Sequence, residues 1–157
     1  MNPPASLDAL NLLLDRATQE RDRLAGELRR GEEVVLRARR QGEQLDGYRG
    51  EYTQRWSAQF GRGGAIEIVH CYQSFMQRLD EAMSLVHDQL QRSEATVAAR
   101  RAELTAAELR TASVRKLIER RRQERGRVQA RVEQKLGDEA AQAIVRRTQG
   151  RGLSLHH

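Results

Sequence analysis

A heptad repeat that keeps its phase through nine heptads constrains the fold of this chain more than any other feature. From Val69 to Val132, mostly apolar side chains return at alternating steps of three and four residues. Residues at these steps share one face of an α-helix, so the pattern is typical of a coiled-coil seam. The a positions are Val69, Met76, Met83, Leu90, Val97, Leu104, Thr111, Ile118, Arg125 and Val132, and the d positions are Tyr72, Leu79, Val86, Ser93, Arg100, Ala107, Val114, Arg121 and Val128.

Another heptad repeat begins at Leu7, on the N-terminal side of the repeat at residues 69–132. Ser6 is the predicted N-cap of this helix, with Asp8 in the first turn, where the helix dipole favours an acid. Most of its seam positions are also apolar, which predicts another long helix. The a positions are Leu7, Leu14, Arg21, Leu28, Val35, Gly42, Arg49 and Trp56, and the d positions are Leu10, Ala17, Leu24, Gly31, Ala38, Leu45 and Tyr52.

The stretch FGRGG, residues 60–64, separates the two repeats. Its three glycines indicate a turn, and helices joined by a short turn run antiparallel. A turn centred near residue 62 or 63 places Leu28 near Val97, Leu45 near Leu79 and Leu7 near Ile118.

The predicted fold class is therefore all-α, a long antiparallel two-helix coiled coil whose second helix overhangs the first. Residues 1–157 are expected to form one hairpin domain. Residues 1–5 read as an extended lead, followed by helix 1 at about 6–60, a turn at 61–64, helix 2 at about 65–148 and a flexible tail at 149–157.

Composition agrees with long helices. Both prolines, Pro3 and Pro4, stand at the start, and aromatic residues make up only 4% of the chain. The single cysteine, Cys71, excludes an internal disulfide and fits a reducing cytoplasm. No apolar run is long enough for a transmembrane helix, so any membrane contact is expected through partners.

The net charge of +6 belongs to one segment. Residues 110–135 contain ten Lys or Arg and three Glu, a net +7, whereas the rest of the chain sums to −1. Most of this segment lies beyond Ile118, on the overhang that ends near Thr148, and its charge favours an acidic partner. Two interpretations stay open: a solvated extension, or a helix whose narrow stripe of Val128, Val132 and Leu136 is buried by another protein.

Nucleic acid is a less favoured partner for this segment. The basic arm of a bZIP coiled coil precedes its zipper, whereas the arginines here follow the seam. They also alternate with Glu119, Glu124 and Glu133, which oppose phosphates.

Catalytic and metal sites are not indicated. His70 and Cys71 are adjacent, so on a helix they point about 100° apart and cannot share a metal ion. No nucleophile–base pair, P-loop or Gly-rich nucleotide motif is visible, which predicts a non-enzymatic protein without a cofactor.

All six aromatic residues fall within residues 48–75, on both sides of the turn. Tyr52 and Tyr72 occupy seam positions and are expected to lock this end of the hairpin. Tyr48 and Phe75 stand at g positions, outside the seam, and are expected on a binding face, since partly exposed aromatics are favoured interface anchors.

The chain resembles the FliJ family of flagellar export proteins over residues 7–147. The resemblance rests on length, hairpin layout and three stretches. These are LLLDRATQERDRLAGELRRG at 12–31, YRGEY at 48–52 together with CYQSFMQRLDEA at 71–82, and VEQKLGDEAAQAIVRR at 132–147. It implies a coiled coil similar to the gamma stalk of rotary ATPases. Such a protein links a FliI-like export ATPase hexamer to the FlhA-like export gate and escorts export chaperones.

The resemblance also implies two sets of partner-binding residues and a cytoplasmic protein peripheral to the export apparatus of the inner membrane. The alternatives are a generic homodimeric coiled-coil scaffold or, with less support, a basic nucleic-acid-binding coiled coil. The gate-binding set is Gln41, Leu45, Tyr48, Tyr52, Phe75, Leu79 and Ala82, and the ATPase-binding set is Arg120, Arg121, Arg122, Arg125, Arg127, Val128, Arg131 and Val132.

Overall fold

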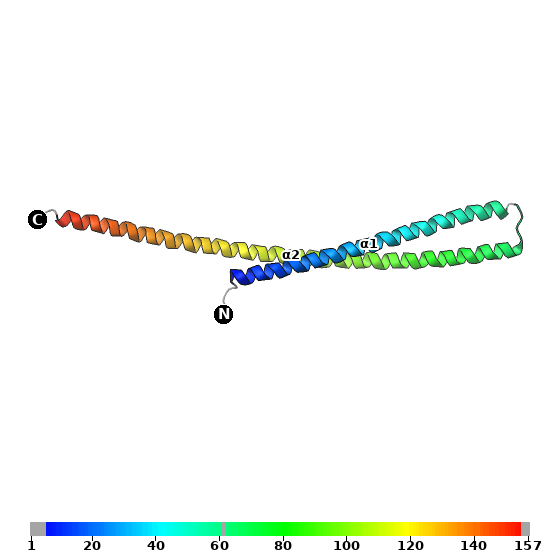
Figure 1. The fold of residues 1–157 in the computed structure, drawn as a ribbon, viewed down its shortest axis with the longest axis horizontal. Coiled ribbons are helices and arrows are strands. Elements are labelled where there is room, and N and C mark those ends of the chain that lie inside the picture. Colours follow the sequence, from blue (N-terminus) through cyan, green and yellow to red (C-terminus); the bar gives the residue numbers. More distant parts are fainter. Residues whose placement is uncertain (1–5, 61, 155–157) are drawn as a thin grey trace. The chain divides into compact units, whose positions relative to one another are not determined.

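The fold consists of two long helices that pack antiparallel, as expected from the heptad repeats (Figure 1). The computed structural model describes residues 6–60 and 62–154, with side chains described up to residue 152. Helix α1 spans Leu7–Phe60 and helix α2 spans Ile66–Ser154, and no strand occurs in these ranges. The all-α hairpin prediction is confirmed, whereas the extended lead at 1–5 lies outside the described residues.

The start of α1 is capped as the sequence predicts. The hydroxyl Oγ of Ser6 accepts a hydrogen bond from the backbone N–H of Ala9 at 3.2 Å, and the Ser6 carbonyl accepts one from Leu10 at 3.0 Å. Asp8 lies in the first turn, at the positive end of the helix dipole. The Ser6 hydroxyl thus satisfies the N–H of Ala9, which has no partner within the helix, and the Ser6 carbonyl accepts the first helical hydrogen bond.

The turn between the helices depends on one left-handed glycine. Gly63 has φ of 82°, a conformation that side chains disfavour. Before it, the N–H of Arg62 donates to the Gln59 carbonyl at 3.1 Å. After it, the Ala65 carbonyl accepts hydrogen bonds from Ile68 and Val69, which begins α2.

The end of α2 differs from the prediction. The helix continues to Ser154, although a flexible tail was expected from residue 149. Gly150 and Gly152 prompted that expectation, yet neither adopts a positive φ that would terminate a helix. A glycine weakens a helix by about 1 kcal/mol relative to alanine without breaking it. The rest of the predicted tail, residues 155–157, lies outside the described residues.

The described contacts divide the hairpin into two compact units. One, the hairpin unit, comprises residues 17–109, and the other, the terminal unit, comprises residues 1–16 and 110–157. Side chains in a two-helix layer contact only nearby residues along the helices, so no single core gathers the whole chain.

The hairpin unit contains the turn and a seam of small and aliphatic side chains. Both helices contribute to this seam. Its buried members are Leu24, Val35, Ala38, Leu79, Val86, Val97 and Ala107.

The terminal unit has a shorter core where the first turns of α1 pack on α2. Leu10, Val114 and Ile118 are buried together, with Leu7 and Leu14 packed against them. Thr111 is also buried. Within this unit α2 continues well past the start of α1 (Figure 1), so its later residues have no α1 residue beside them. Every buried residue in the described ranges thus occupies a predicted a or d position.

The register of the hairpin unit is displaced by three residues from the prediction. Leu28 was expected beside Val97, but a Cβ atom placed on Gly31 would lie 3.3 Å from Cγ2 of Val97. Likewise, a Cβ on Gly42 would lie 3.6 Å from Cγ1 of Val86. The two seam glycines therefore lie opposite valines, and the absence of their side chains allows the helices to approach closely.

Candidate partner-binding surfaces

An aromatic cluster closes the end of the hairpin unit next to the turn. The ring centroids of Trp56 and Tyr72 are 5.0 Å apart, and Phe60 lies 5.4 Å from Trp56 and 5.6 Å from Tyr72. These three side chains are half-buried and join the two helices across the turn. Tilted and edge-to-face ring pairs at such distances add about 0.5–1.5 kcal/mol each beyond area burial. This cluster is structural.

A second aromatic pair lies beside this cluster and is more accessible. The rings of Tyr52 and Phe75 are 4.7 Å apart, and the guanidinium of Arg55 lies 5.8 Å from the centre of the Tyr52 ring. Phe75 is 41% exposed and Tyr48 is 51% exposed. The g-position aromatics thus present apolar surface to solvent on a rigid helical support.

The predicted gate-binding set divides by burial. Gln41, Tyr48 and Phe75 are exposed, whereas Leu79 is buried in the seam. A side chain inside the seam supports its neighbours and cannot itself be a main contact of a partner. The remaining members, Leu45, Tyr52 and Ala82, are half-buried.

Charged pairs connect the two helices of the hairpin unit beside this surface. Arg49 Nε donates to Asp80 Oδ1 at 2.8 Å, and this hydrogen bond is the main cause of the raised pKa of Arg49. Arg39 and Glu94 form a similar pair at 3.0 Å. Such exposed pairs help to select the register but add little stability.

Sequence reasoning missed apolar residues that lie outside the seam. Ile66 is exposed in the first turn of α2, and Leu85 is exposed farther along it. Both occupy heptad positions that normally face solvent, and this mismatch between residue type and position was the available signal. Together with Tyr48 and Phe75, they make the surface of the hairpin unit more apolar than the heptad pattern suggests.

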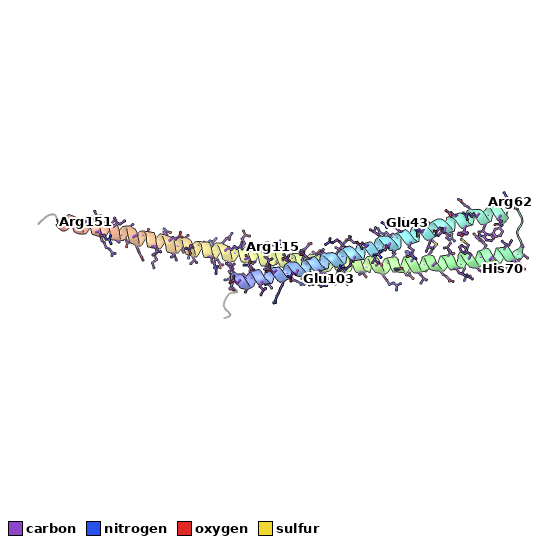
Figure 2. The ribbon with its side chains drawn as sticks, viewed as in Figure 1. Glu43, Arg62, His70, Glu103, Arg115 and Arg151 are labelled. Atoms are coloured by element: carbon purple, nitrogen blue, oxygen red, sulfur yellow. The ribbon has the colours of Figure 1, made fainter. Side chains whose placement is uncertain are left out.

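The second surface is the basic segment of α2 in the terminal unit. Figure 2 shows side chains projecting from α2 along its length between Arg115 and Arg151. Arg121 is half-buried, and every side chain described from Arg122 to Gly152 is exposed. The predicted ATPase-binding residues are all exposed except Arg121, with Val128 at 58% and Val132 at 49%.

The arginines from Arg115 to Arg147 have no acidic partners within the described ranges. None of the residues from Arg115 to Arg147 takes part in an ion pair there. The positive charge is therefore available to another molecule, and the segment is the most basic part of the chain.

The part of the chain that the structure describes contains no candidate metal centre and no candidate membrane span. In the described ranges, no three His, Cys, Asp or Glu side chains gather as ligands for a metal ion. No described helix is long and apolar enough to cross a bilayer.

The antiparallel helical hairpin, with exposed aromatics in one unit and exposed arginines in the other, defines an all-α coiled-coil protein. The model of the flagellar FliJ protein family matches residues 6–150. The chain belongs to the FliJ family and is a flagellar export-related protein; members of this family are non-catalytic components of flagellar export. No curated protein sequence and no solved structure matches the chain.

Proposed function

We propose that this protein couples the export ATPase to the export gate and escorts export chaperones, working in the cytoplasm at the inner-membrane export apparatus. The observation that carries the proposal is the presence of two exposed surfaces of different chemistry, one in each unit. The hairpin unit presents Tyr48 and Phe75, and the terminal unit presents Val128 and Val132 among arginines that, from Arg115 to Arg147, form no ion pair within the described ranges.

The basic segment of α2 is the proposed contact for a FliI-like ATPase hexamer. A stalk that contacts several subunits of a ring needs a long exposed helix, and residues 122–152 of α2 are exposed throughout. Their positive charge suits an acidic surface and speeds association with it.

The aromatic surface is the proposed contact for an FlhA-like gate. Tyr48 and Phe75 offer rigid apolar anchors, and Gln41 adds an exposed polar group from α1. Anchors of this kind contribute most of the binding energy in protein interfaces.

Binding to each purified partner tests the proposal, together with measurement of ATPase stimulation. A chain ending at Glu119 keeps the core of Leu10, Val114 and Ile118 but lacks the basic extension. It should lose ATPase binding and stimulation while keeping gate binding. The double variant Tyr48→Ala with Phe75→Ala should lose gate binding while keeping ATPase binding and stimulation. Full ATPase stimulation by the shortened chain, at unchanged helicity, would refute the assignment.

A further inference from the structure

We infer that residues 121–132 of α2 bind an acidic amphipathic helix of the partner, which continues the coiled-coil seam beyond the start of α1. This inference deepens the proposed function and rests on it for the identity of the protein that supplies the helix.

The first observation is the continuity of the seam. From Ile118, steps of three and four residues lead to Arg121, Arg125, Val128 and Val132, so all five lie on one face of α2. Ile118 is buried against α1, whereas Val128 and Val132 are about half exposed. The face that α1 covers therefore continues along α2 with no described residue packed on it.

The second observation is an open hollow at the point where α1 begins. Ser6 and Leu7 line one side of it, and Arg121, Glu124, Arg125, Val128 and Gln129 line the other, around a volume of about 600 Å³. Side chains of a second helix placed along α2 could enter this hollow. Leu7 and Val128 provide its apolar contacts, and the two arginines provide its charge.

Charge identifies the chemistry of the occupant. Arg121 and Arg125 stand on the seam itself and have no ion-pair partner within the described ranges. A purely apolar helix would bury these guanidinium groups unpaired, which is strongly unfavourable. Carboxylates on the incoming helix would pair with them in two-pronged hydrogen bonds.

A polyanion without apolar side chains fits the face less well. It would leave Val128 and Val132 exposed and would bring negative charge close to Glu124. The apolar part of the seam ends at Val132, because the next seam positions are the charged residues Lys135 and Glu139. The occupant therefore needs about three to four turns of helix, or about 18 Å.

A peptide-binding experiment with the full chain tests the inference. The probe is a fluorescent 21-residue peptide with leucine at a and d and glutamate at the flanking positions, compared with a scrambled peptide of equal composition. Fluorescence anisotropy at physiological salt should show about tenfold tighter binding of the patterned peptide. Equal binding of the scrambled peptide, or of an oligonucleotide or anionic vesicles, would overturn the inference.

Matched variants locate the site. Val128→Ser with Val132→Ser, and separately Arg121→Ala with Arg125→Ala, should each weaken binding about tenfold. Val145→Ser is the control, since Val145 is exposed on α2 but stands off the seam. Circular dichroism checks that helicity is unchanged. An unaltered affinity in the double valine variant would overturn the inference.

The same variants separate this inference from the proposed function. If the double valine variant loses the peptide but binds the purified ATPase normally, the ATPase assignment stands and the inference that the ATPase supplies the seam helix is overturned. If the unmodified chain binds the patterned peptide but not the ATPase, the helix-binding face stands and the proposed function fails.

Discussion

Replacement of Ile118 by alanine tests whether the short core of the terminal unit holds the start of α1 on α2. Ile118 is 5% exposed and packs with Leu10 and Val114. The change removes three carbon atoms from this core, each worth about 0.8 kcal/mol of burial. A two-helix layer can relax around the gap or admit water, so the cavity adds little. We expect the free energy of unfolding to fall by about 2–3 kcal/mol.

Two measurements can detect this loss of stability. With an m value of about 1–3 kcal/mol per molar urea, the midpoint of the urea transition followed by circular dichroism should fall by about 1 M. Amide hydrogen exchange should accelerate by about thirty-fold or more in the first turns of α1, if they open locally. Val114 and Ile118 then no longer form a closed core with Leu10.

The neighbouring residue provides the control for this prediction. Leu117 is 44% exposed and lies outside the buried core. Leu117→Ala removes the same number of carbons but should lose only about 1 kcal/mol, since part of the side chain is already in water. Equal shifts in the two variants would refute the assignment of this core, as would an unmoved midpoint for Ile118→Ala.

Three further substitutions test other parts of the fold. Gly47 has open space around its Cα, so Gly47→Ala should stabilise the chain by about 0.5–1 kcal/mol. Gly31→Ala should stabilise the chain less, because the new Cβ would lie 3.3 Å from Val97. The midpoints of urea unfolding of the two variants test which one is more stable. Ser6→Ala removes the N-cap of α1 and should lower the free energy of unfolding by about 1 kcal/mol. Ser6→Asp should restore this stability in the same assay, because its carboxylate can also accept the N-cap hydrogen bond. Trp56 is the sole tryptophan, so Tyr72→Ala should shift its fluorescence emission to the red as the ring contact at 5.0 Å is lost, whereas His70→Ala should leave it unchanged.

The candidate surfaces were only partly visible in the sequence. The g positions of Tyr48 and Phe75 correctly predicted exposure, because a side chain beside the seam cannot be fully covered by one facing helix. Leu79 belongs to the same proposed set, yet it is buried at a d position. A resemblance to a family groups residues by role, whereas burial depends on which of them the facing helix covers.

What the sequence alone determined is the identity of the inward faces. Heptad spacing is a property of each helix by itself, and every buried residue in the described ranges stands at a predicted a or d position. The cap at Ser6 was equally local, because a hydroxyl reaches only the N–H groups of the next turn.

The tertiary structure decided how the two faces meet. A heptad repeat presents a similar seam at many offsets, so periodicity cannot select among registers that differ by a few residues. In the hairpin unit the left-handed Gly63 sets the path of the turn, and Gly31 and Gly42 receive Val97 and Val86. Steric fit between side chains from distant parts of the chain selected this register, and that fit exists only once both helices are packed.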